Sequence, residues 1–211
     1  MPFIDKNSMT DHWFSSDERF NELYPPSVSA LSRRHWTPLR VARKAAKFLA
    51  AADNVRILDI GSGAGKFCLA AGHFEPKAFF CGIEQRKNLV GDAQTAGRIL
   101  GLENVNFMHG NFTQLDFADY DHFYFYNSFY ENLTGTDKID SSIDYSANLY
   151  NYYNRYLYKL LDKKKPGTRL VTYHSLEDEI PPDYHLVGSE MEGLLKFRIK
   201  VMPALDQLLF G

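Results

Sequence analysis

The sequence predicts an α/β fold around a mostly parallel sheet of about seven strands, and three observations predict it. A buried apolar strand over 55–60 runs directly into a glycine-rich turn and an apolar helix start. Four further apolar strands alternate with helical patterns, which favours parallel pairing. The last two strands, over 184–189 and 194–202, are joined around Gly193 with no room for a crossover helix. We therefore expect an antiparallel last strand.

The remaining elements follow from helix caps, breakers and apolar periodicity. Thr37-Pro38 predicts a helix start, with the threonine hydroxyl as the N-cap and proline in the first turn. Helices are expected over 39–52, 65–73, 86–100 and 145–161, and further strands over 78–84, 105–109, 121–126 and 168–173. The polar segment over 134–144 is expected to be a mobile loop.

Composition limits the classes of protein. The chain has 211 residues and a net charge of -2, which gives no general attraction to nucleic acid. We expect an extension or lid over 1–37 and one domain over 38–211. Cys68 and Cys81 have no disulfide or metal spacing, so no metal is expected. The first twenty residues do not look like a signal peptide, and no apolar run approaches the ~20 residues of a membrane span. A cytoplasmic protein without a membrane partner is expected.

The glycine turn over 59–65 has several interpretations, which its flanking residues separate. A phosphate-binding P-loop needs glycine where Ile60 stands and a hydroxyl where Phe67 stands. A dinucleotide fingerprint needs glycine where Lys66 stands. A tight strand–helix turn without a ligand is the structural alternative.

What remains is an acid-x-Gly-x-Gly-x-Gly pattern after an apolar strand, which resembles class I S-adenosylmethionine (SAM)-dependent methyltransferases over about 37–202. The resemblance implies a three-layer Rossmann-like fold with an N-terminal helical extension, SAM as the cofactor and S-adenosylhomocysteine as the product. Asp59 would hold the ammonium of SAM, and the backbone of the turn would suit its carboxylate. The turn residues expected to bind the cofactor are Gly61, Ser62, Gly63 and Gly65.

Three further stretches add candidate cofactor residues. Glu84 ends the second strand, where a carboxylate accepts both ribose hydroxyls. Asn111 follows the third strand, where the family places a polar group for the adenine amino edge, and Phe112 is placed to stack on the ring. Thr37, in an aromatic-Thr-Pro step, is expected to close over SAM as well as to cap the helix. The plain interpretations are a solvated strand end, a loop amide and a helix cap.

The fourth strand ends in Asn127-Ser128-Phe129-Tyr130. This segment resembles a relaxed form of the [Asn/Asp]-Pro-Pro-[Tyr/Phe] tetrapeptide of methyltransferases that act on planar nitrogens, without its two prolines. It is also similar to the Asn-x-Phe segment of Dot1-like lysine methyltransferases, whose glycine turn matches as well. The resemblance makes Asn127 and Tyr130 the candidate catalytic residues, with Asn127 also near the cofactor. A strand end that packs the core is the alternative.

The sequence therefore predicts SAM-dependent methyl transfer, with nitrogen as the expected target. A nicotinamide-dependent oxidoreductase and a non-catalytic SAM-binding protein are the rival hypotheses. The methyl acceptor is left open between protein, nucleic acid and small molecule. His174 follows the fifth strand, where it would serve either as a base or as a structural residue.

Overall fold

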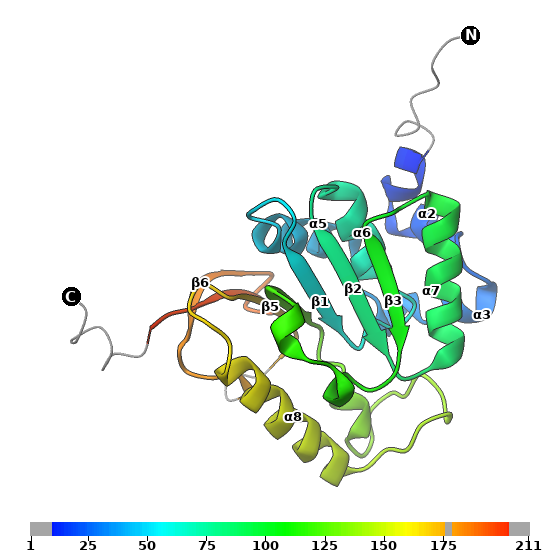
Figure 1. The fold of residues 1–211 in the computed structure, drawn as a ribbon. Coiled ribbons are helices and arrows are strands. Elements are labelled where there is room, and N and C mark those ends of the chain that lie inside the picture. Colours follow the sequence, from blue (N-terminus) through cyan, green and yellow to red (C-terminus); the bar gives the residue numbers. More distant parts are fainter. Residues whose placement is uncertain (1–9, 176–178, 203–211) are drawn as a thin grey trace.

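The computed structural model describes residues 10–175 and 179–202, which form one seven-stranded sheet with helices on both faces (Figure 1). The strand order is β3-β2-β1-β4-β5-β7-β6. The predicted α/β fold with an antiparallel last strand is confirmed. Residues 1–9 of the expected extension and 203–211 of the expected domain lie outside the described residues.

The strands lie close to their predicted positions. They are β1 (Arg56–Ile60), β2 (Phe79–Glu84), β3 (Val105–His109), β4 (His122–Phe125), β5 (Arg169–Tyr173), β6 (Tyr184–Glu190) and β7 (Leu195–Lys200). The α-helices are α2 (Asp17–Asn21), α3 (Pro26–Ser29), α4 (Ser32–His35), α5 (Leu39–Leu49), α6 (Lys66–Phe74), α7 (Lys87–Leu100) and α8 (Ala147–Asp162). Short 3-10 turns are η1 (Asp11–Phe14), η2 (Phe112–Gln114), η3 (Phe117–Asp119) and η4 (Tyr130–Asn132).

The sheet reverses its direction of growth between β1 and β4. β1 pairs in parallel with both β2 and β4, and β4 pairs in parallel with β5. β7 pairs antiparallel with β5 and with β6, so β7 inserts between these two strands. Ligands of open α/β sheets bind at the carboxyl ends of the strands where the order reverses, and here that point lies between β1 and β4.

Each face of the sheet buries its own hydrophobic core. Ile57 and Tyr124 belong to the core under α5, α6 and α7, and Leu58 and Phe123 belong to the core under α8. Successive residues of a strand point to opposite faces, which explains this division. Figure 1 shows α8 on the face of the sheet opposite to α5, α6 and α7. The result is the expected three-layer arrangement.

The N-terminal segment packs into the same core as the sheet. Phe20 is fully buried there. The Tyr24 hydroxyl donates to the carbonyl of Ala64 at 2.8 Å, and the Lys66 ammonium contacts Asp17 at 2.5 Å. The described part of this segment is therefore attached to the glycine turn and to the start of α6.

The expected cap of α5 is wrong. Pro38 is the N-cap and makes no side-chain cap, and the N–H of Leu39 donates to Asp17 Oδ1 at 3.0 Å. The Thr37 hydroxyl lies 2.9 Å from the Tyr124 hydroxyl instead. A distant carboxylate thus does the capping, which local sequence could not show. α5 also ends at Leu49, earlier than predicted.

Candidate active site

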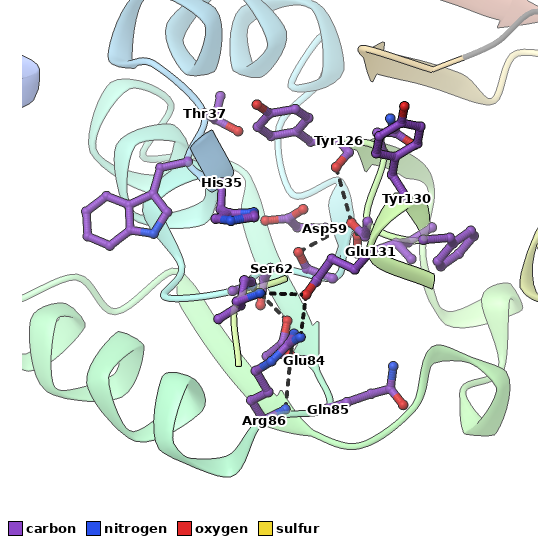
Figure 2. A pocket seen from close by; sticks show the side chains of 18 of the residues that line it. His35, Thr37, Asp59, Ser62, Glu84, Gln85, Arg86, Tyr126, Tyr130 and Glu131 are labelled. Atoms are coloured by element: carbon purple, nitrogen blue, oxygen red, sulfur yellow. Dashed lines mark hydrogen bonds and ion pairs between the residues drawn. The ribbon is translucent and has the colours of Figure 1, made fainter. Parts of the chain in front are cut away.

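A cavity of about 990 Å³ opens at the carboxyl ends of β1, β2, β4 and β5. Most of the residues predicted from the sequence line it: Thr37, Asp59, Gly61, Ser62, Gly63, Glu84, Phe112, Asn127 and Tyr130. Figure 2 shows Asp59, Ser62 and Glu84 between His35 on one side and Tyr130 on the other. Gly65 and Asn111 are not among the lining residues.

The three glycines of the turn have different physical reasons to be glycine. All have positive φ: 76° at Gly61, 53° at Gly63 and 84° at Gly65. A Cβ at Gly61 would lie 2.4 Å from Ser128, and one at Gly65 would lie 2.6 Å from the Phe107 ring. A Cβ at Gly63 would meet nothing within 4 Å. Gly61 and Gly65 are therefore required by packing, whereas Gly63 presents bare backbone to the cavity.

Asp59 is a buried carboxylic acid facing the cavity. It is 3% exposed, and the Cys68 thiol donates to its Oδ2 at 3.6 Å. Burial, aided by the charge of Glu84, raises the pKa of Asp59 to about 8. Among the described residues no cationic side chain pairs with it. A cationic group of a ligand would stabilise its ionised form.

Glu84 is held in place by backbone and by Arg86. Its Oε2 accepts from the N–H of Gly63 at 3.1 Å, so the end of β2 is bonded to the glycine turn. Its Oε1 accepts from the Arg86 backbone N–H at 2.9 Å and from Nη1 at 3.2 Å. The carboxylate is fixed at the position where the sequence predicted a ribose-binding acid.

Arg86 also ties the cavity to the loop over 134–144. Its Nη2 donates to Glu131 at 2.6 Å and to the Tyr145 hydroxyl at 2.7 Å. Its Nε donates to Asp140 at 3.2 Å. The guanidinium is 3% exposed and shares its charge among three carboxylates, including that of Glu84. Figure 2 shows Arg86 reaching from the end of β2 towards Glu131.

Asn111 lies beside the cavity, and its side-chain amide is hydrogen-bonded within the protein. Oδ1 accepts from the N–H of Thr113 at 3.0 Å, and Asn111 with Gln114 forms a capping box at η2. Nδ2 donates to Gln85 at 3.0 Å and to the Tyr153 hydroxyl at 2.9 Å. Phe112 lines the cavity but is buried against Phe129, with ring centroids 5.1 Å apart. The plain interpretation of Asn111 as a loop amide fits this structure better.

The segment after β4 faces the cavity in an unusual conformation. Asn127 has a φ of 39°, which is uncommon for a residue with a side chain. Its carbonyl accepts from the N–H of Tyr130 at 3.0 Å, and Ser128 Oγ donates to the carbonyl of Ile60 at 2.6 Å. The side chain of Asn127 makes no hydrogen bond within the described chain. The amide is thus available to a ligand.

Several lining residues were not predicted from the sequence. They are Arg86, Glu131, Tyr145, His35, Tyr126 and Tyr173. The sequence contains one indication of the role of Arg86, because a cation two residues after an acid that ends a strand is a candidate to pair with that acid. Tyr173 ends β5 and Tyr126 follows β4. His35, Glu131 and Tyr145 come from α4, η4 and a loop, whose approach to the cavity depends on tertiary structure.

The residues of the cavity fit SAM. Asp59 lacks a cation, and Gly63 leaves room for a ligand beside its backbone. The Ser62 hydroxyl is buried with no hydrogen-bond partner in the described chain. Polar groups left without partners inside a protein are costly, and a polar ligand would relieve that cost.

Comparison with known proteins defines the class. A family model described as a methyltransferase domain matches residues 51–194, more than half of the chain. The chain therefore belongs to this family of SAM-dependent methyltransferase domains. In the described residues no helix is long and apolar enough to cross a membrane.

Named relatives match only part of the chain. A tRNA (guanine-N(7)-)-methyltransferase of Microcystis aeruginosa is 46% identical over 54 residues, 26% of each chain. That of Synechococcus sp. is 44% identical over 54 residues, 26% of this chain and 23% of the relative. The chain thus spans about a quarter of the length of these curated relatives.

Solved structures share the fold at low identity. An RNA methyltransferase from Salinibacter ruber, in complex with S-adenosylhomocysteine, superposes with a TM-score of 0.57 at 22% identity and covers 80% of this chain and 97% of its own. The putative methyltransferase yhhF from Escherichia coli gives 0.53 at 15% identity, over 76% and 82% of the two chains. At these identities the likeness concerns the fold.

Proposed function

We propose that this methyltransferase transfers its methyl group to a nitrogen atom of a planar acceptor, and that an RNA base is the first acceptor to test. The observation that carries the proposal is Asn127, whose unpaired amide faces the cavity from the end of β4. An amide oxygen there is suited to accept a hydrogen bond from the N–H of the target.

Aromatic side chains around Asn127 support a planar acceptor. Tyr130 lines the cavity and is 49% exposed, so its ring is accessible for stacking. Tyr126 and Tyr173 also line the cavity, with their ring centroids 4.8 Å apart. Aromatic faces favour flat, conjugated ligands. The curated relatives named above are tRNA methyltransferases, which supports RNA as the first choice.

Roles for the cofactor residues follow from chemistry. SAM, when bound, supplies a methyl group on a sulfonium, which is already a good electrophile. We assign Asp59 to its ammonium and Glu84 to its ribose hydroxyls. The turn N–H groups that were expected to bind its carboxylate already donate within the protein, those of Gly61 and Ser62 to the carbonyl of Ile83 and that of Gly63 to Glu84. Much of the rate would then come from orienting the acceptor nitrogen in line with the methyl group in a cavity shielded from water.

Two rim segments are proposed to close over the ligands. Residues of the extension, from Ser32 to Thr37, line one side of the cavity, and the loop over 134–144 lines the other. Arg34 and Asp137 form an ion pair between them at 2.5 Å. Acceptor specificity would reside in these segments.

The test is transfer of a tritiated methyl from SAM into a cell extract that is then separated into RNA, protein and small molecules. We expect label in RNA, and digestion to nucleosides should recover it in nucleosides methylated on a base nitrogen, separated by chromatography from 2′-O-methyl and C-methyl nucleosides. Asn127→Ala should reduce labelling at least tenfold while S-adenosylhomocysteine still binds. Label recovered only in 2′-O-methyl or C-methyl nucleosides, or full labelling by Asn127→Ala, would contradict the proposal. Tight NAD binding without SAM binding would favour an oxidoreductase.

A further inference from the structure

The ends of β4 and β5 place His174 next to Asn127. The two strands are parallel neighbours, with Phe125 opposite Thr172. The same register puts Tyr126 opposite Tyr173, and their ring centroids are indeed 4.8 Å apart. Asn127 and His174 are the next residues along the chain, just beyond the carboxyl ends of these two neighbouring strands. Both residues line the cavity.

Both residues leave their strands in the same rare conformation. His174 has a φ of 58°, and Asn127 has 39°. The N–H of His174 donates to the carbonyl of Leu194 at 2.9 Å, in the turn before β7, and this bond stabilises the left-handed backbone. Such backbone conformations persist only where surrounding structure enforces them, and they concentrate at functional sites.

The surroundings of His174 keep its imidazole available as a base. Its ring lies against Tyr173 of β5, with centroids 4.3 Å apart, and near Tyr126, which follows β4, at 5.6 Å. Burial among these rings lowers the pKa of His174 from its ordinary value, so the ring is neutral at pH 7. Neither ring nitrogen has a hydrogen-bond partner in the described chain.

The other groups of the cavity that could accept a proton are the imidazole of His35 and the carboxylates of Asp59, Glu84, Glu131, Asp137 and Asp144. Glu84 and Glu131 are paired with Arg86, and Asp137 with Arg34. Asp144 belongs to the loop over 134–144. Asp59 is buried beside Cys68 and is assigned to the cofactor. His35 comes from α4 on the rim, and its surroundings include the charges of Glu131 and Arg34. His174 lines the cavity from the end of β5, the strand that pairs with the one preceding Asn127.

We propose that His174 is the general base of this enzyme, taking the proton from the acceptor nitrogen that Asn127 positions. The inference rests on the proposed nitrogen acceptor. The nitrogen lone pair forms a bond to the methyl carbon, the carbon–sulfur bond breaks, and its electrons stay on the sulfur of neutral S-adenosylhomocysteine. The proton of the methylated nitrogen passes to the imidazole and then to solvent.

The experiment measures tritiated methyl transfer from SAM into unfractionated, SAM-depleted cell extract between pH 5.5 and 9.5. The wild-type rate should rise to a plateau by pH 7, where His174 is neutral. His174→Gln should lose about 10²–10⁴-fold at pH 7, and its rate should keep rising above pH 8 as the acceptor deprotonates unaided. His174→Ala should recover activity with added imidazole. S-adenosylhomocysteine affinity, measured by calorimetry, should stay within twofold in both variants.

His185→Gln is the matched control, because His185 is exposed on β6 and does not line the cavity. A His174→Gln enzyme with wild-type rate and pH profile would overturn the assignment while leaving nitrogen methylation in place. A variant that loses S-adenosylhomocysteine binding as well would also overturn it, since a base for the acceptor should not affect the cofactor. A wild-type enzyme that labels nothing would overturn both proposals.

Discussion

Arg86 donates to Glu131 at 2.6 Å while its other terminal nitrogen donates to Glu84 at 3.2 Å. One buried guanidinium therefore links the acid at the end of β2 to the segment that follows β4. Arg86 also donates to Asp140 of the loop over 134–144. If ligand binding moved Glu84, Arg86 would transmit that movement to the loop.

Arg86→Met should lower the free energy of unfolding by about 3–5 kcal/mol, because it leaves Glu84 and Glu131 without their cation. Chemical denaturation followed by circular dichroism checks this. Arg19→Met is the control: its pair with Glu22 is more than half exposed, so a change under about 1 kcal/mol is expected. Equal decreases in the free energy of unfolding of the two variants would show that the buried ion pairs of Arg86 stabilise the fold no more than an exposed pair does.

Asp59→Asn should separate stability from binding. The pKa of Asp59 is about 8 in the folded protein against 3.8 as the ordinary value. The folded state therefore holds a proton that the unfolded state has lost, and stability falls as pH rises from about 4 to 8. The amide removes this slope, so the variant should gain in Tm relative to wild type between pH 5 and pH 8.5.

The same variant should lose the thermal shift that S-adenosylhomocysteine gives the wild type, because it has no carboxylate for the ammonium. The groups packed around Asp59 are Cys68 of α6, Glu84 of β2 and Tyr124 of β4, and they stay unchanged. Unaltered ligand affinity in Asp59→Asn would refute the role given to this residue.

Gly63→Ala and Gly61→Ala should fail in different ways. The alanine at 63 meets no neighbour, so only its φ of 53° opposes it, at about 1–2 kcal/mol. Its methyl group would stand where the ligand approaches, and S-adenosylhomocysteine binding should weaken at least tenfold in a folded protein. The alanine at 61 would overlap Ser128, and the protein itself should unfold more readily. Calorimetry and thermal melts distinguish the two; tight binding by Gly63→Ala would argue against close backbone contact.

Asp17→Ala should destabilise the protein by about 1–3 kcal/mol, because Asp17 both caps α5 through Leu39 and neutralises buried Lys66. Asp53→Ala removes an exposed partner of Lys77 and serves as the control. Differential scanning calorimetry of the two proteins is the measurement. Identical Tm values would mean that the N-terminal segment adds little to the domain.

The topology, and the position of Asp59 and Glu84 at the carboxyl ends of two strands, were predictable because they follow from local patterns. The pattern of a strand, a glycine turn and a helix start predicted the position of Asp59, and the expected end of β2 predicted that of Glu84. Both residues line the cavity. Apolar runs broken by turn residues located the strands, and the short connection at Gly193 identified the antiparallel pair.

The features that escaped prediction depend on partners distant in sequence. Asp17 replaces Thr37 as the cap of α5 across 22 residues, and Arg86 meets Asp140 across 54. Asn111 looked like a ligand group because its capping-box partners and Tyr153 could not be placed from the sequence alone. The position of a residue was predictable where the local backbone determines it. It was not predictable where it depends on a partner that only the folded chain brings near.

Insertion of β7 between β5 and β6 sets an order for the assembly of the enzyme during synthesis. Until residues 195–200 leave the ribosome, β5 has an open edge, although the strand itself and the whole glycine turn are already made. The cofactor half can therefore form before the half that carries His174, whose N–H is bonded to Leu194. A chain stopped at Gly193 would leave an apolar strand edge bare, which makes such nascent or truncated chains prone to aggregate.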